Sequence, residues 1–251
     1  MECISVFDML KIGVGPSSSH TLGPWRAAER WLKELQEQNL FNAITNVKVN
    51  LYGSLSLTGR GHATDSAVIL GLLGKDPVTV PVEHIPSLLK DVTKQKTLLL
   101  NSSYNISFDP ATDIVFHKEF LSFHANGMVF EAFTKENTTA TETYYSIGGG
   151  FVVKESRNKA ETNATIFTSF PFPIRTGEEL LTYCNKEQKS ISSIVLANER
   201  SLAKDTDIDK QLKQIWDTML ECMYTGCHTQ GILPGGLQVK RRAYDMHQKL
   251  K

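Results

Sequence analysis

Residues 13–21 read Gly-Val-Gly-Pro-Ser-Ser-Ser-His-Thr, a loop of glycines and hydroxyl side chains that follows a short apolar segment at residues 4–12. Apolar residues then recur at helical spacing, at Trp25, Ala28, Leu32 and Leu35. We therefore expect an amphipathic helix over residues 22–38 directly after the loop. A serine or threonine side chain of the loop would accept hydrogen bonds from the first backbone amides of this helix. His20 adds a group that changes charge near neutral pH. The stretch is either a well-capped helix start or a site for a carboxylate or phosphate.

A second glycine-rich loop carries another histidine. Residues 47–52 alternate apolar and polar side chains, which predicts a half-buried strand that ends at Gly53. The sequence Leu-Thr-Gly-Arg-Gly-His-Ala-Thr-Asp then occupies residues 57–65 and leads into a helix expected over residues 66–73. His62 in this loop is either a helix cap or part of a second binding corner. A glycine-rich loop that carries a histidine and leads into a helix thus occurs twice, and we find no other internal repeat.

The rest of the chain predicts a sheet followed by helices. Short runs typical of strands occur at residues 104–108, 114–116, 128–133 and 141–147. Successive short strands joined by turns indicate an antiparallel sheet, and with the two early helices they give an α+β fold. Helical spacing returns later, at residues 177–185, 191–200 and 207–228. We therefore expect an α+β domain over residues 1–170 and a helical domain over residues 171–251, with a boundary near Phe170.

The composition argues against several classes of protein. The 251 residues include 27 Lys and Arg and 27 Asp and Glu, so the formal net charge is zero and no basic footprint for nucleic acid is expected. No apolar run approaches the ~20 residues needed to cross a bilayer, and the first residues lack the order of a signal peptide. The four cysteines are sparse and irregularly spaced, which fits a reducing compartment rather than a disulfide framework. We expect a cytoplasmic protein that binds neither nucleic acid nor a membrane.

Five segments together resemble the iron–sulfur-dependent L-serine dehydratases, also called L-serine ammonia-lyases. They are residues 5–9 with 13–21, residues 61–68, 123–127, 145–151 and 231–243. Each segment alone is a weak signal, but five in the family's order over essentially the whole chain are specific. The resemblance implies the β domain of that family, followed by the start of its helical α domain. It also implies conversion of L-serine to pyruvate and ammonia, with one iron of a [4Fe–4S] cluster acting on the leaving hydroxyl and a protein base removing the α-proton.

The resemblance also implies roles for individual residues. His62 is the expected base, because the unperturbed pKa of an imidazole, ~6.5, lies near the operating pH. The residues expected to hold the carboxylate or to line the same cleft are Ser17, Ser18, Ser19, His20, Thr21, His124 and Asn126. His20 either contacts the substrate or only orients its loop, and Ala125 stands where the family usually has proline. The residues expected to close the cleft from the helical domain are Gly235, Gly236, Lys240, Arg241 and Arg242, of which the last three also fit a solvated run of charge.

The cysteines depart from what the family's cofactor needs. A cubane cluster with an open iron takes three thiolates, but Cys222 and Cys227 are five residues apart and therefore face about 140° apart on a helix. No metal ligand is expected among Cys3, Cys184 and these two, so the [4Fe–4S] cluster is expected only in a longer, complete enzyme.

We therefore expect an N-terminal part of the enzyme that is inactive alone. Its expected partners are L-serine, a missing C-terminal α domain and a second copy joined through the β domains. The alternatives are a non-enzymatic module that senses serine, and a subunit completed by a separate cluster-bearing chain.

Overall fold

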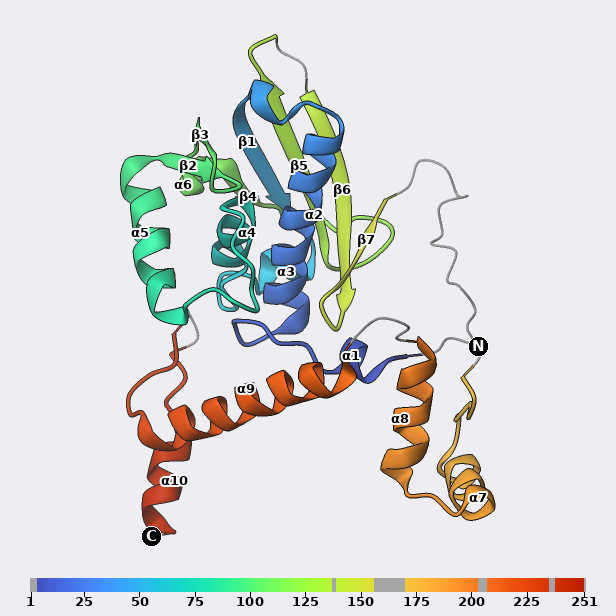
Figure 1. Cartoon of the computed structure of the whole chain (residues 1–251). Helices are drawn as coiled ribbons and strands as arrows, with labels where there is room; N and C mark the ends of the chain where they lie inside the picture. Colours follow the sequence, from blue (N-terminus) through green and yellow to red (C-terminus); the bar gives the residue numbers. More distant parts are fainter. Residues whose placement is uncertain (1–3, 137–138, 156–169, 203–206, 235–237, 251) are drawn as a thin grey trace. The chain divides into compact units, whose positions relative to one another are not determined.

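The structure of the chain is a computed structural model that describes residues 4–136, 139–155, 170–202, 207–234 and 238–250. It divides into two units (Figure 1). The sheet unit comprises Ile12–Arg157 and Gln230–Arg242, and the helical unit comprises Met1–Lys11, Asn158–Thr229 and Ala243–Lys251. The domain boundary expected near Phe170 stays a prediction.

Strand β1 (Ile44–Leu51) lies inside the sheet of the first unit. Among the described residues the sheet has seven strands in the order β2-β3-β1-β5-β6-β7, with β4 paired to β1 outside this path. The other strands are β2 (Thr97–Leu100), β3 (Tyr104–Ser107), β4 (Ile114–Phe116), β5 (Gly127–Thr134), β6 (Thr139–Gly148) and β7 (Phe151–Lys154). Four of them lie within a few residues of the strands predicted from the alternation.

The sheet is mixed, so the expectation of a wholly antiparallel sheet is wrong, whereas the α+β class is confirmed. β5 runs antiparallel to β1 and pairs Phe130 with Val49, but β4 runs parallel to β1 and pairs Ile114 with the same residue. β3 is also parallel to β1. The reason lies in the connections: β2, the first strand after the helical segment that follows β1, pairs antiparallel with β3, so β3 resumes the direction of β1. The helical turn at Pro110–Asp113 then leads into β4, which keeps that direction.

The segment between β1 and β2 contains three helices. They are α3 (Ser54–Leu57), α4 (Thr64–Leu72) and α5 (Ile85–Gln95). Single turns complete the unit: η1 (Ser18–Leu22), η2 (Phe41–Ala43), η3 (Val82–His84) and α6 (Pro110–Asp113). In α4 every residue from Ala67 to Leu72 is buried, so this helix packs on all sides, as its nearly uniform apolar sequence indicates.

Helix α2 (Gly23–Glu37) covers one face of the sheet (Figure 1). Its predicted apolar side is confirmed, since Trp25, Ala28, Leu32 and Leu35 are at most 2% exposed, and Trp31 is buried with them. They pack in one core with Val47, Val49 and Leu51 of β1. Burying a large apolar side chain stabilises a fold by about 1.5–3 kcal/mol. This packing fixes the N-terminal end of α2, and with it the loop at residues 13–21.

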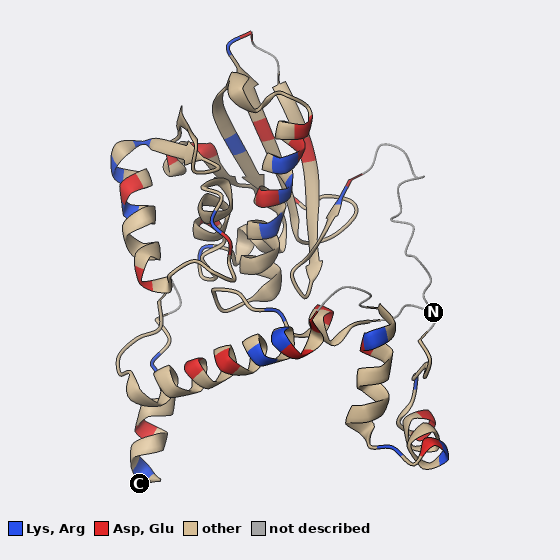
Figure 2. Ribbon diagram, viewed as in Figure 1, with Lys and Arg blue, Asp and Glu red and all other residues tan. Residues whose placement is uncertain are grey.

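The solvent side of α2 alternates acidic and basic side chains (Figure 2). Glu34 is the most connected of them. Its carboxylate accepts hydrogen bonds from Arg30 at 2.9 Å, from the hydroxyl of Tyr144 at 2.8 Å and from Lys154 at 2.6 Å. Because Tyr144 lies on β6 and Lys154 on β7, this one carboxylate ties the helix to the edge of the sheet.

The helical unit contains α1 (Val6–Met9), α7 (Gly177–Glu187), α8 (Ile191–Leu202), α9 (Ile208–His228) and α10 (Ala243–Lys249). The three helices predicted in this part of the chain are confirmed, and α10 was not anticipated. Glu199 of α8 is 5% exposed and accepts hydrogen bonds from the Ser5 hydroxyl at 2.8 Å and the Val6 amide at 2.6 Å. This buried carboxylate fastens the first residues to α8. None of the described helices combines the length and apolar character that a bilayer crossing requires.

Candidate functional site

The loop at residues 13–21 forms a capped turn that leads directly into α2. The Ser17 hydroxyl accepts a hydrogen bond from the His20 amide at 3.3 Å, which is the N-terminal cap expected from the sequence. Gly15 has a φ of 107°, and a Cβ there would collide with the Thr21 side chain. The amides of Ser18 and Ser19 have no acceptor among the described residues. A helix start with two open amides and partial positive charge is suited to bind a carboxylate.

His20 is held by a hydroxyl at each ring nitrogen. Its Nδ1 lies 2.9 Å from Ser19 Oγ, and its Nε2 lies 2.9 Å from Ser54 Oγ at the start of α3. Burial lowers the pKa of His20, the nearby His62 lowers it further, and a hydrogen bond with the Ser54 backbone opposes both. His20 is therefore a neutral ring at pH 7, fixed in orientation by its two hydroxyl partners.

His62 is presented by the turn between α3 and α4. Ala63, which follows it, adopts a left-handed conformation with a φ of 57°. His62 Nδ1 lies 2.9 Å from the Thr58 carbonyl oxygen, which can only accept, so Nδ1 carries the proton. The lone pair of the neutral ring is then on Nε2. An imidazole anchored in this way can take up a proton at a defined atom.

The structure brings the two glycine-rich loops together. The ring centroids of His20 and His62 are 4.9 Å apart, with a tilt of 36°. Two hydrogen bonds join the loops directly: the Thr21 hydroxyl donates to the His62 carbonyl at 3.3 Å, and the Thr64 hydroxyl donates to the His20 carbonyl at 2.7 Å. The two loops therefore form one corner that holds two imidazoles side by side.

The segment with His124 and Asn126 lies against the same corner through Ser54. The Ser54 amide donates to the Ala125 carbonyl at 2.8 Å, while the Ser54 hydroxyl contacts His20. Asn126 is 9% exposed and its side-chain amide donates to the Ser146 carbonyl at 3.0 Å, so it braces the turn against β6. His124 Nδ1 accepts from the Asn126 amide at 3.1 Å, which leaves its Nε2 as the donor. Their contact with substrate stays a prediction.

Ser54 is the residue that sequence reasoning missed. It connects His20 with the Ala125 turn and is the first residue of α3, directly after Gly53. A polar residue at the end of a predicted strand is a common position for function, so this signal was present in the sequence.

The residues expected to close the cleft stay untested. Gly235 and Gly236 lie outside the described residues. Lys240 pairs with Ile232 in a single β-bridge, and the Arg241 amide donates to the Gly231 carbonyl at 2.8 Å, so this segment folds back on itself. The part played by Lys240, Arg241 and Arg242 remains a prediction.

The described residues do not fit a [4Fe–4S] cluster. Such a cluster is held by several thiolates that converge on one point. Cys184 lies on α7, and Cys222 and Cys227 lie five residues apart on α9. Within the described ranges, no group of three or more His, Cys, Asp or Glu side chains is placed to hold a metal ion.

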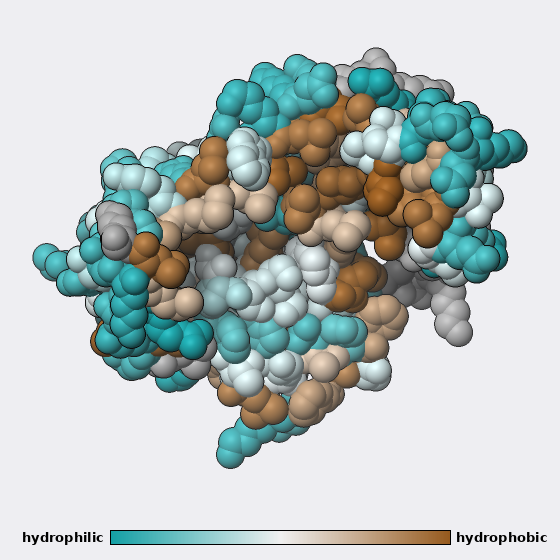
Figure 3. All heavy atoms as spheres, turned by 90° about the horizontal axis from the view of Figure 1, so that it is seen from below, coloured by the Kyte–Doolittle hydropathy of each residue, from teal (hydrophilic) through white to brown (hydrophobic). Residues whose placement is uncertain are grey.

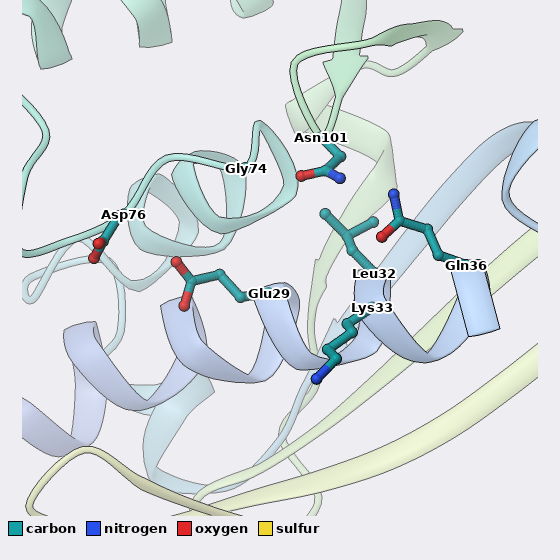
Figure 4. A pocket seen from close by; sticks show the side chains of 7 residues that line it. All are labelled: Glu29, Leu32, Lys33, Gln36, Gly74, Asp76 and Asn101. Carbon is teal, nitrogen blue, oxygen red and sulfur yellow. The ribbon is translucent and has the colours of Figure 1, made fainter. Parts of the chain in front are cut away.

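A cavity of about 210 Å³ lies elsewhere on the sheet unit, between α2 and the turn after α4 (Figure 4). Its lining is polar apart from one leucine and consists of Glu29, Leu32, Lys33, Gln36, Gly74, Asp76 and Asn101. Burial raises the pKa of Glu29, but Arg26 donates to its carboxylate at 2.8 Å and stabilises the charge. None of the predicted site residues lines this cavity.

Comparison with known proteins connects both parts of the chain to one family. The serine dehydratase beta chain family matches residues 5–157, and the serine dehydratase alpha chain family matches residues 186–251. L-serine dehydratase 1 of Escherichia coli is 41% identical over 248 residues, and L-serine dehydratase of Streptomyces coelicolor is 42% identical over 250 residues. These alignments cover 98% and 99% of this chain but 54% and 55% of the relatives. The chain therefore spans about half the length of the curated relatives it matches.

Proposed function

The chain belongs to the serine dehydratase family, and we propose that it supplies the substrate-binding corner of an L-serine dehydratase, which converts L-serine to pyruvate and ammonia. The observation that carries the proposal is the pairing of His20 and His62, 4.9 Å apart, beside the open amides of Ser18 and Ser19. This corner combines a place for a carboxylate with a proton acceptor, and the relatives are named L-serine dehydratases.

In this proposal the substrate carboxylate binds at the start of η1. The amides of Ser18 and Ser19 donate to it, and the hydroxyls of the same loop complete its shell. The partial positive charge of the turn that leads into α2 adds to this binding, because the two helical segments are continuous. In this proposal the loop binds the carboxylate through backbone amides and hydroxyls, without a lysine or arginine of its own.

His62 then removes the α-proton at Nε2. Its Nδ1 keeps its proton and donates it in a hydrogen bond to the Thr58 carbonyl oxygen, which stabilises the positive charge that develops on the ring. The neutral His20 contributes no opposing charge at that moment. Its two hydroxyl partners hold it, which supports a role in orienting the loop and the neighbouring ring.

A [4Fe–4S] cluster of the family's kind would act on the leaving hydroxyl, but its ligands are not found among the described residues. We propose that the cluster ligands come from polypeptide other than the described residues of this chain. The scarcity of cysteine also supports the second candidate, a serine-binding module or subunit without catalysis of its own. The homodimer through the β domains remains a prediction from the resemblance, and the cytoplasmic location remains a prediction from the sparse cysteines.

The test is a titration of the isolated chain, followed through the imidazole nitrogen signals of its histidines. We expect L-serine to shift the His20 and His62 signals saturably, and L-serinamide, which lacks the carboxylate, to have little effect. Equal responses to the two compounds, or no saturable response to L-serine, would refute the proposal. Anaerobic reconstitution with iron and sulfide then separates the candidates. Serine-dependent pyruvate formation by this chain alone would show that it supplies the cluster ligands after all.

A further inference from the structure

Helix α9 carries an apolar side that the described residues do not cover. Its members recur at helical spacing and are 37–54% exposed: Leu212, Trp216, Met219, Leu220 and Met223. These positions fall within about 100° of the helix circumference, the width of an ordinary packing surface. We refer to them as the α9 stripe. Ile208 is the one buried residue among the 21 of this helix.

The opposite side of α9 is polar and exposed to solvent. Lys210, Gln214 and Glu221 lie there and are exposed. Lys213 and Asp217, which lie between that side and the stripe, form an ion pair of 2.7 Å, and both side chains are more than half exposed. Helix α10 contacts the end of α9, where His247 Nδ1 lies 3.3 Å from the Cys227 carbonyl oxygen. The helix thus has one solvated side and one side suited to another helix.

An exposed apolar surface of this length marks a site of interaction. Figure 3 shows hydrophobic side chains gathered on the face that carries α9. The stripe extends over about three turns, with large side chains at i, i+4, i+7, i+8 and i+11, which is the pattern by which one helix packs along another.

We propose that the α9 stripe is the docking surface for a helical segment of the serine dehydratase alpha chain, drawn from the part of the relatives that this chain does not match. Residues 186–251, which include α9, match the alpha chain family, and the matched relatives are nearly twice as long as the matched region. The proposal rests on the proposed function, since it assigns a surface on which that enzyme would be assembled.

Oxidation of individual methionines can measure whether the α9 stripe is covered. Met219 and Met223 lie in the stripe and are 47% and 52% exposed, whereas Met246 on α10 is 63% exposed and Met128 is fully buried. Hydrogen peroxide oxidises exposed methionine to the sulfoxide, and mass spectrometry resolves each site. In the isolated chain we expect Met219, Met223 and Met246 to react and Met128 to be protected.

The chain, carrying an affinity tag, is co-expressed with the part of the Escherichia coli relative that the alignment leaves uncovered. We expect that segment to co-purify and to protect Met219 and Met223 while Met246 stays reactive. Leu220→Glu should lower capture at least about tenfold, because a carboxylate buried without a partner costs more than one factor of ten in affinity. Gln214→Glu places the same charge on the solvated side and should leave capture unchanged. Circular dichroism verifies that both variants keep their helices.

Several results would overturn the proposal. These are failure of the segment to co-purify in soluble form, equal capture by both variants, and a complex in which Met219 and Met223 remain as reactive as Met246. Protection that grows with the concentration of the chain alone would assign the stripe to a second copy instead. The L-serine titration is independent of the stripe. Serine binding without capture refutes only the docking surface, and capture without serine binding refutes only the proposed function.

Discussion

Replacing Ser54 by alanine tests the arrangement of the histidine corner. The change removes the hydroxyl 2.9 Å from His20 Nε2 and leaves the Ser54 backbone bond to the Ala125 carbonyl in place. Burial and the charge of His62 lower the pKa of His20, and a hydrogen bond with the Ser54 backbone, which the variant keeps, raises it. Without the hydroxyl, the imidazolium loses a possible acceptor at Nε2, so we expect the pKa of His20 to fall further below its ordinary value.

The cost in stability is expected to be small. A net intramolecular hydrogen bond contributes about 0.5–1.5 kcal/mol, and both partners here are only partly buried, so we expect about 1 kcal/mol. For a unit of this size that corresponds to a fall in Tm of roughly 2–4 °C. The functional effect should be larger than the stability effect, because a ring freed at Nε2 no longer holds its position beside His62.

The assay is a pH titration of the imidazole nitrogen signals, with thermal unfolding in parallel. Ser54→Thr keeps the hydroxyl and should restore the pKa of His20. Ser56→Ala, on the same short helix, should leave it unchanged. If the pKa of His20 stays the same or rises in the folded Ser54→Ala variant, then Ser54 does not hold the ring and the reasoning fails.

Three further predictions concern the sheet unit. Gly53→Ala should lower the free energy of unfolding in urea by about 2 kcal/mol or more, because Gly53 has a φ of 55° and a Cβ would collide with the Ala125 carbonyl, whereas Gly177→Ala at an open position should have little effect. Glu34→Gln should cost about 1–3 kcal/mol in the same assay, since Lys154 and Arg30 lose a charged partner, and an unchanged midpoint would contradict this. Unfolding should become easier as pH falls from about 7 to 5, because unfolded His20 binds its proton more readily than folded His20, and His20→Gln should flatten that dependence in thermal melts.

The sequence was a good guide wherever periodicity decided the outcome. The stripe of α2 and the alternation of β1 predicted which side chains are buried, because a core face repeats at the period of its element. The direction of β3 and β4 could not be obtained in this way. Periodicity reports which face of a strand is buried but carries no information about the direction of its neighbour, which depends on the connections between the strands.

The candidate site shows the same division. The two loops were identified from glycine, serine and histidine content, yet their meeting depends on how α2 lies on the sheet. Ser54 illustrates the limit: its contact with His20 joins residues 34 positions apart, and no local pattern specifies such a contact. Residue types predicted the chemistry of the corner, and packing determined which hydroxyl holds which ring.

Helices α2 and α9 have similar amphipathic sequences but different surroundings, and this difference separates what the two units can do. Trp25 and Trp31 of α2 are at most 1% exposed, while Trp216 of α9 is 54% exposed. The sheet unit therefore fixes its loops with its own core, and its corner should bind a carboxylate in the isolated chain. The described part of the helical unit leaves the corresponding surface of α9 exposed, and in our proposal a helix of the alpha chain covers it. Serine binding and catalysis should accordingly be separable: binding should be present in the chain alone, and turnover should appear only when the α9 stripe is covered.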